Sequence, residues 1–184
     1  IIEVEVKKVT DDPRPESRKI KADTVQIVDR IEDRKERRKF LMKISDSSLD
    51  IPLKEKRTLA VIKPQIENFK VKKEVLESIQ LTLNGKTFKR NPYGDVGLYY
   101  EWRCSKPCQY CKGKHHVMRC FDWGANVLYR KYSNEREAEI KTKQMCFYKM
   151  KYDYDTWFAL GTHSRRPFTK WMIVGLLWMK KVQK

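Results

Sequence analysis

The segment from residue 102 to residue 123 holds most of the metal-binding side chains of this chain. The chain has five cysteines and three histidines in 184 residues, and this segment contains Cys104, Cys108, Cys111, Cys120, His115 and His116. Thiolates and imidazoles are the usual ligands of tetrahedral zinc, and short loops between ligands lower the entropic cost of gathering them. The spacing Cys108-x2-Cys111 is typical of half of such a site. The segment therefore predicts a loop that is held together by a zinc ion, with the strands on either side of it placed next to each other.

Two sets of four ligands compete for this zinc ion. The first set is Cys108, Cys111, His116 and Cys120, which is one residue short of a zinc-knuckle spacing. The second set takes Cys104 in place of Cys120, with His115 or His116 as the imidazole. We favour Cys104, Cys108, Cys111 and His116, because Cys120 falls in a predicted strand, where a cysteine is more often a small buried apolar residue. Four protein ligands would make the site structural, since a catalytic zinc keeps one position for water.

The cysteines are expected to be reduced. Their number is odd, and the chain opens with Ile-Ile-Glu-Val-Glu-Val, which lacks the basic residues and apolar run of a secretory signal. We find no run of about 18 apolar residues, so no membrane-spanning helix and no membrane partner are expected. These observations favour a cytoplasmic protein that binds zinc over one with disulfides, while unliganded thiols stay open as an alternative.

The charge of the chain favours polyanionic partners. Lysine and arginine number 41 against 24 acidic residues, a formal net charge of +17. The excess is concentrated in residues 101–184, which carry 18 basic and 7 acidic side chains. A positive field of this size attracts nucleic acid first, and acidic proteins or a larger complex after it. Lys/Glu-rich surfaces also occur in thermophilic proteins, but balanced charges would not explain the surplus.

Basic side chains near the cysteine segment are the predicted phosphate contacts. The nucleic-acid-binding candidates are Arg165, Arg166, Lys112, Lys114, Arg119 and Arg130. Arginine binds phosphate through two parallel hydrogen bonds, and the loop His-Ser-Arg-Arg would follow a rigid strand. Several aromatic residues interleave with these cations, as on surfaces that stack the bases of single strands, and we expect one or two of them to be exposed. The sequence does not distinguish DNA from RNA as the partner.

Hydrophobic patterning predicts an α+β fold. We expect a mixed or antiparallel sheet with two or three packed helices, and a zinc-clipped hairpin built from residues 97–104 and 115–122. Asp122 is placed to cap a helix that begins at Trp123, and a second helix is expected from Asn134 to about Lys151. Residues 156–162 and 170–178 are apolar enough to form a central hairpin covered on both faces.

The first half of the chain is expected to form a separate region. Residues 1–90 are predicted to hold strands and a helix, and residues 91–184 the zinc-clipped core, with one continuous domain as the alternative. Ile2, Val4 and Val6 alternate with charged residues, which predicts a half-buried strand, and residues 24–31 predict a second strand. Residues 31–44 read as an amphipathic helix.

Two function classes stay open at this point. The first is a non-catalytic nucleic-acid-binding module shaped by zinc. The second is a phosphodiester-cleaving enzyme, with His163 or His116 as the acid/base, Asp122 as the orienting carboxylate and Arg166 stabilising charge on phosphate. The second class requires these side chains to converge within hydrogen-bonding distance.

The C-terminal half also resembles a family of uncharacterised prokaryotic proteins. The resemblance is carried by an H-x-M, DW, LYR, GTH, P and W-x-I-x-G pattern, here His116, Met118, Asp122, Trp123, Leu128, Tyr129, Arg130, Gly161, Thr162, His163, Pro167, Trp171, Ile173 and Gly175. This sequence departs from the family at Gly124, where an acidic residue is usual, and in its extra cysteines. The resemblance implies a prokaryotic, intracellular protein and brings no established activity.

Overall fold

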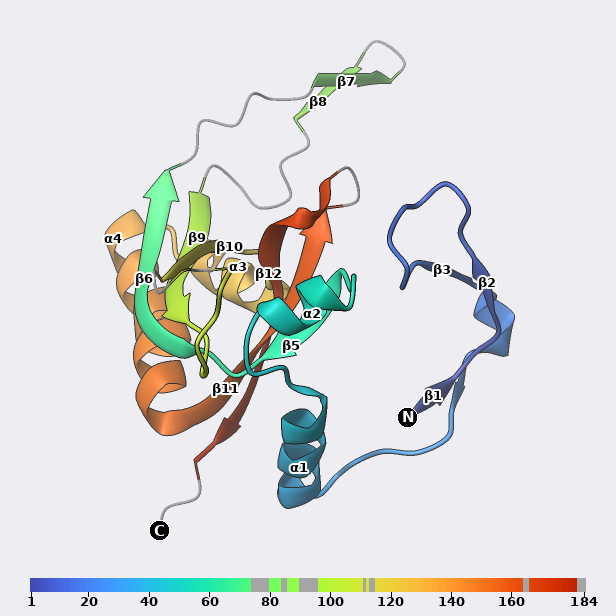
Figure 1. Ribbon diagram of the computed structural model, residues 1–184. Helices are drawn as coiled ribbons and strands as arrows, with labels where there is room; N and C mark the ends of the chain where they lie inside the picture. Colours follow the sequence, from blue (N-terminus) through green and yellow to red (C-terminus); the bar gives the residue numbers. More distant parts are fainter. Residues whose placement is uncertain are drawn as a thin grey trace.

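A six-stranded mixed sheet forms the body of the protein. The computed structural model describes residues 1–73, 80–83, 86–89, 96–110, 112, 115–163 and 166–181, without the side chains of 80–83, 86–89 and 166. The strand order is β5-β11-β12-β10-β9-β6, and the sheet is curled (Figure 1). The strands are β5 (Leu59–Ile62), β6 (Gln65–Lys73), β9 (Val96–Arg103), β10 (His116–Cys120), β11 (Tyr154–His163) and β12 (Arg166–Lys180). Neighbours pair antiparallel except β10 and β12, which are parallel.

The helices complete the predicted α+β architecture. Within the described residues the α-helices are α1 (Arg34–Ile44), α2 (Asp50–Lys54), α3 (Trp123–Arg130) and α4 (Glu135–Lys143), and α4 runs into a π-helix, η2 (Gln144–Asp153). The predicted cap is confirmed, since the Asp122 side chain accepts a hydrogen bond from the Ala125 amide. The predicted α1 and α4 are also present, although the second half of the latter is a π-helix. None of the described helices is long and apolar enough to span a membrane.

The core lies between the sheet and the η2 helix. Alternate residues of β9 point into it, and Tyr100 and Trp102 have no exposed surface. The Tyr100 hydroxyl donates to the carbonyl oxygen of Cys146 in η2 and therefore ties the helix to the middle of the sheet. Burial raises the pKa of the Tyr100 hydroxyl well above its ordinary value, so the group stays protonated and keeps donating this bond. Phe158 of β11 packs against both aromatic rings of β9.

The β9–β10 hairpin was predicted and is present. Its register pairs His116 with Trp102 and Cys120 with Leu98. Because side chains alternate across a strand, His116, Met118 and Cys120 face the core while Val117 is exposed and Arg119 partly exposed on the outer face. The end of β9 and the start of β10 therefore lie side by side, with the cysteine-rich loop between them.

The β11–β12 hairpin differs from its prediction in one respect. Both strands form and pair along most of their length, but only β11, which lies between β5 and β12, is covered on both faces. On β12 the side chains of Val174 and Trp178 are each 45% exposed. The expectation of two covered faces was wrong for β12, because Trp171 and Ile173 are buried against the core while Val174 and Trp178 are exposed to solvent.

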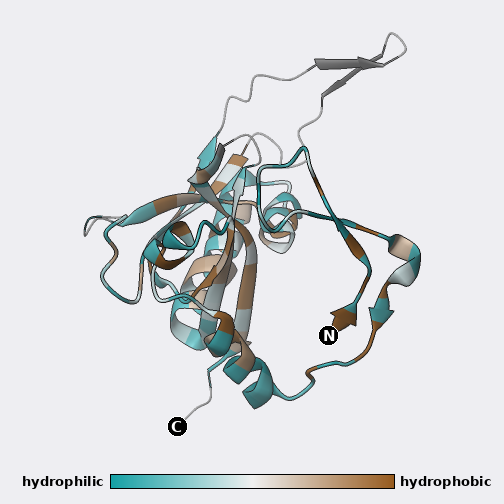
Figure 2. Ribbon diagram, turned by 45° about the vertical axis from the view of Figure 1, so that its right-hand side comes forward, coloured by the Kyte–Doolittle hydropathy of each residue, from teal (hydrophilic) through white to brown (hydrophobic). Residues whose placement is uncertain are grey.

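The N-terminal segment forms two small ribbons instead of half-buried strands. The ribbons pair β1 (Ile2–Glu3) with β4 (Gln26–Ile27) and β2 (Val6–Lys8) with β3 (Arg18–Ile20). Most of residues 24–31, predicted as one strand, lie in irregular chain around β4, after a short 3₁₀ turn at Ala22–Thr24. The apolar residues of the ribbons are exposed, so alternation here did not signal burial, and Figures 1 and 2 show this segment to one side of the body.

Strands from both predicted regions share the sheet. Strands β5 and β6 precede residue 90, yet β5 pairs with β11 and β6 pairs with β9. The predicted boundary between residues 90 and 91 lies outside the described residues. The Glu16 carboxylate connects the N-terminal segment to the sheet, since it accepts hydrogen bonds from the amide and the hydroxyl of Thr58, each at 2.6 Å.

Candidate metal centre

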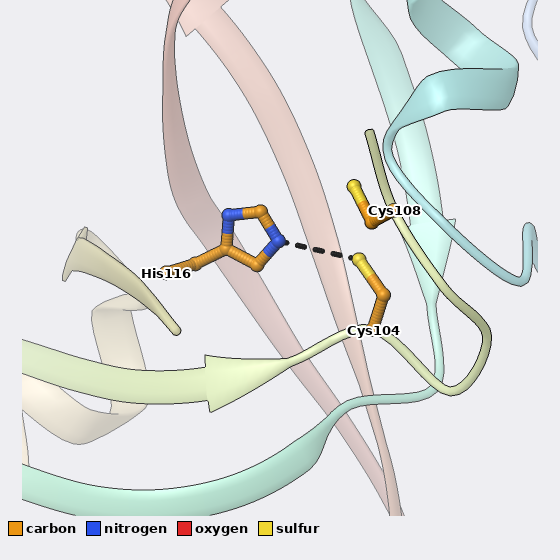
Figure 3. A group of neighbouring side chains, drawn as sticks. All are labelled: Cys104, Cys108 and His116. Atoms are coloured by element: carbon orange, nitrogen blue, oxygen red, sulfur yellow. Dashed lines mark hydrogen bonds between the residues drawn. The ribbon is translucent and has the colours of Figure 1, made fainter. Parts of the chain in front are cut away.

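Three of the four predicted ligands come together at the loop end of the β9–β10 hairpin. Cys104 directly follows β9, Cys108 lies in the loop, and His116 is the first residue of β10. Their two sulfur atoms and one ring nitrogen all lie within 4.8 Å of one another. The Cys104 Sγ atom is 3.2 Å from the His116 Nε2 atom, and Figure 3 shows both cysteine side chains directed toward this edge of the imidazole ring. The three side chains are close enough to hold a metal ion.

The donor set and its burial suit a tetrahedral ion. Ligand bonds of 2.0–2.3 Å place the donor atoms of such a site about 3.5–3.8 Å apart, so these donors need to move by about 1 Å or less. All three residues are buried, with 6–7% of their surface exposed. Burial keeps water from the site, which is typical of a structural centre and not of a catalytic one.

His116 is held in an aromatic stack. Its ring lies 4.4 Å from the ring of Trp102 and 6.1 Å from that of Tyr110, the latter in a stacked orientation of 17°. Burial lowers the pKa of His116 to about 4, so the ring is neutral at pH 7. A neutral imidazole is the form that binds a metal.

Asp50 anchors the loop that carries Cys108. Its carboxylate accepts hydrogen bonds from the backbone amides of Gln109 at 2.6 Å and of Tyr110 at 2.8 Å. The Cys108 Sγ atom lies 3.7 Å from the same carboxylate. Burial raises the pKa of Asp50, but the two amide hydrogen bonds, the contact with Cys108 and the charge of Lys54 together lower it more, so the net pKa lies below its ordinary value. The carboxylate is therefore ionised at neutral pH and fixes the loop as an acceptor.

The remaining predicted ligands divide into three cases. Cys111 lies outside the described residues. Cys120 is 1% exposed in the core, and four residues along a strand separate it from His116 by about 13 Å, so the knuckle-like ligand set does not assemble in the described part of the chain. Burial raises the pKa of the Cys120 thiol, as expected for an inert core cysteine. His115 points away from the cluster, with its Nδ1 atom 3.7 Å from a Glu67 carboxylate oxygen.

The catalytic candidates are only partly brought together. His163 and His116 both line one pocket, whereas Asp122 is not among its lining residues. One Asp122 oxygen accepts from the Ala125 amide at 2.8 Å and the other from the Leu176 amide at 3.1 Å. The carboxylate thereby caps α3 and joins it to β12. The side chain of Arg166 is not described.

Replacing Asp122 by alanine is expected to lower the free energy of unfolding by about 2–3 kcal/mol, because the mutant loses a helix cap and leaves the Leu176 amide unpaired. Urea denaturation followed by circular dichroism measures the loss. Asp122→Asn keeps one acceptor oxygen and is expected to lose about half as much. Unchanged stability in Asp122→Ala would show that these hydrogen bonds do not hold the helix in place.

The predicted phosphate contacts do not form one cluster in the described part of the chain. Arg165 and Lys114 lie outside the described residues, and Lys112 is exposed with a positive φ of 46°. The Arg119 guanidinium lies 4.6 Å from the centroid of the Phe121 ring, and that of Arg130 lies 5.3 Å from the exposed Trp123 ring.

The interleaved aromatic residues also separate into two groups. Tyr100 and Trp102 are core residues, while Tyr110 is 44% exposed and Tyr99 and Phe121 are partly exposed. Tyr110 is therefore the exposed ring among these five described residues, in agreement with the one or two expected.

Sequence reasoning missed Asp50 and the pocket. Asp50 lies 58 residues before Cys108 in a short polar stretch, and no local pattern links the two. Searches of protein-family models, curated proteins and solved structures found no match to this chain. The resemblance to an uncharacterised prokaryotic family therefore stays a prediction.

Proposed function

We propose that this protein is a nucleic-acid-binding module whose surface is shaped by a structural zinc ion. The observation that carries the proposal is the pocket beside the metal centre, which is lined by aromatic and basic side chains. The positive charge of the chain supplies long-range attraction to a polyanion. DNA and RNA both satisfy this chemistry, and assembly into a larger complex is compatible with it.

Zinc is the metal that best suits the donors. Two thiolates and a neutral imidazole in a dry site match structural zinc centres, and sulfur ligands disfavour magnesium and calcium. Cys111 is the predicted fourth ligand from the sequence. A site filled by four protein ligands would have no position for a reactive water, so this metal would hold structure and not perform catalysis.

The described pocket favours an anionic, aromatic ligand. Arg119 and Lys170 line it together with Tyr99, Tyr110 and Phe121, and no acidic side chain is among the described residues that do so. Aromatic faces stack on bases while cations contact the backbone phosphates, which is the usual arrangement in proteins that bind single strands.

Phosphodiester cleavage receives less support. Asp122 uses both carboxylate oxygens as acceptors for backbone amides, and the Nε2 atom of His116 is 3.2 Å from Cys104. Both Asp122 oxygens are thus engaged by the backbone, and the Nε2 atom of His116 is directed at the metal cluster. Asp122, the carboxylate expected to orient the histidine, is not among the described residues that line the pocket with His163.

The affinity for nucleic acid is expected to fall steeply with salt. If about five phosphates are contacted, the slope of log K against log salt for a single strand is roughly −3.5, so a rise from about 50 to about 200 mM lowers affinity about 100-fold. Fluorescence anisotropy with labelled single-stranded and duplex DNA and RNA measures this slope. Metal content of the same purified protein is measured by elemental analysis.

A salt-independent affinity, or no binding to any of the four nucleic acids at low salt, would contradict the proposal. Release of shortened products during the titration would instead favour the phosphodiester-cleaving alternative. Lys141→Gln removes one exposed charge on α4, away from the pocket, and is expected to change the slope little.

A further inference from the structure

A pocket opens where β10 and β12 diverge. The two strands pair in parallel at Cys120 and Ile173, and the amide of Phe121 donates to the Ile173 carbonyl at 2.7 Å. From this point toward the metal centre the strands share no further pair. A cavity of about 950 Å³ fills the gap, with lining residues from both strands, from β9 and from the cysteine-rich loop.

The backbone of β12 is strained at the edge of this pocket. Phe168 has a φ of 68°, a left-handed conformation that is an outlier for a bulky residue. Thr169 and Lys170, the next two residues, line the pocket. Backbone outliers of this kind cluster at binding and active sites. The outlier lies in an irregular stretch of β12, since Thr162 of β11 pairs with Trp171 while the next residue, His163, pairs with Arg166.

One wall of the pocket comes from the cysteine-rich loop between β9 and β10, which carries Cys104 and Cys108 and is called the metal loop. Tyr110 stacks on His116, and its hydroxyl donates to the Thr169 carbonyl oxygen at 3.3 Å. This contact connects the cysteine-rich loop to β12 across the gap between the strands. Because Asp50 and the metal ligands fix the same loop, the position of Tyr110 depends on the centre behind it.

The chemistry of the other walls suits a planar, aromatic group attached to phosphate. Tyr99 lies on the outer side of β9, and Arg119 of β10 is its partner across the two strands. Phe121 directly follows β10. Lys72 lies 5.1 Å from the Tyr99 ring centroid and continues the basic and aromatic surface onto β6. Rings and cations thus alternate across three neighbouring strands, and Lys170 faces them from β12.

We propose that this pocket, between β10, β12 and the metal loop, holds one unpaired base of a single-stranded nucleic acid, with the flanking phosphates on Arg119 and Lys170. The inference rests on the proposed function and names its substrate class. Ligand pockets have volumes of about 300–1,000 Å³, so this cavity admits a nucleotide but not a duplex. A base inside a helix cannot present its faces to side chains until it is unpaired and turned out of the stack.

The test uses short single strands that carry one 2-aminopurine, matched strands with an abasic position in its place, and the corresponding duplexes. We expect the full-length protein to bind the single strand at least 10-fold more tightly than the abasic strand or the duplex. The fluorescence of 2-aminopurine is expected to change on binding, because stacking on aromatic side chains alters it. RNA and DNA versions distinguish the two sources of the base.

Phe121→Leu is expected to weaken binding of the base-containing strand roughly 5- to 150-fold and to leave binding of the abasic strand nearly unchanged, since loss of one base–aromatic stack has this effect. Tyr152→Leu is the control, because Tyr152 is 59% exposed at the end of η2 and does not line the pocket. Circular dichroism and metal content of each variant establish that the fold is retained.

Equal affinity for the abasic strand, the duplex and the base-containing strand would overturn the inference while leaving salt-dependent nucleic-acid binding intact. An equal loss for Phe121→Leu and Tyr152→Leu would also overturn it. Absence of binding to every nucleic acid at low salt would instead remove the proposed function itself, so the two failures are distinct.

Discussion

Replacing Cys104 by serine is expected to abolish stoichiometric zinc binding and to destabilise the protein by several kcal/mol. Structural zinc contributes about 10–16 kcal/mol of apparent free energy in zinc-finger peptides. This chain has its own core, with Trp102, Phe158 and Ile173 fully buried, so only part of that contribution appears as global stability. Elemental analysis measures the zinc, and guanidinium denaturation with and without a chelator measures the difference in unfolding free energy.

Cys120→Ala is the matched control for this prediction. Cys120 lies on the same hairpin and is also buried, with 1% of its surface exposed against 7% for Cys104, but it is not part of the metal cluster. The variant is expected to lose about 1–2 kcal/mol through the small cavity that it creates and to retain full zinc. The assignment of the centre would be contradicted if wild-type protein purified under reducing conditions contained no bound zinc. It would also be contradicted if a chelator did not change the free energy of unfolding.

The parts of the fold that were predictable are those with a local signal. Asp122 followed by an apolar helical period predicts the start of α3, and the β9–β10 hairpin follows from two apolar runs on either side of a cysteine-rich loop. The choice of Cys104 over Cys120 was also accessible, because a cysteine at the inward-facing end of an apolar strand belongs to the core.

The parts that were not predictable depend on contacts between distant residues. The exposure of β1 and β2 cannot be read from alternation, because the pattern shows which residues share a face and not whether anything covers that face. The exposure of one face of β12 depends on whether another element packs over that face, which the apolar pattern of the strand does not show. The pocket has the same origin, since its walls come from β9, β10, β12 and the metal loop, and only the diverging strands bring them together.

Asp50 was also not predictable, because it lies 58 residues before Cys108 in the sequence. Replacing Asp50 tests how far metal binding depends on the hydrogen bonds between its carboxylate and the cysteine-rich loop. Asp50→Ala is expected to lower zinc affinity about 10- to 100-fold, the usual effect of removing a group that orients a metal ligand. The alanine variant leaves the amides of Gln109 and Tyr110 without their acceptor and frees the loop that carries Cys108. Competition with a fluorescent zinc chelator measures the affinity.

Asp50→Asn separates the charge of the carboxylate from its geometry. The amide side chain keeps one acceptor oxygen but not two, so its zinc affinity is expected to fall between those of the wild type and Asp50→Ala. Asp33→Ala is the matched control, because Asp33 also accepts a backbone amide at the start of a helix, from Glu36 at 2.9 Å, but on α1. It should weaken α1 and leave zinc affinity unchanged. If Asp50→Ala bound zinc as tightly as Asp33→Ala, the metal ligands would be organised by the hairpin alone, and the contact between α2 and the loop would have no part in the centre.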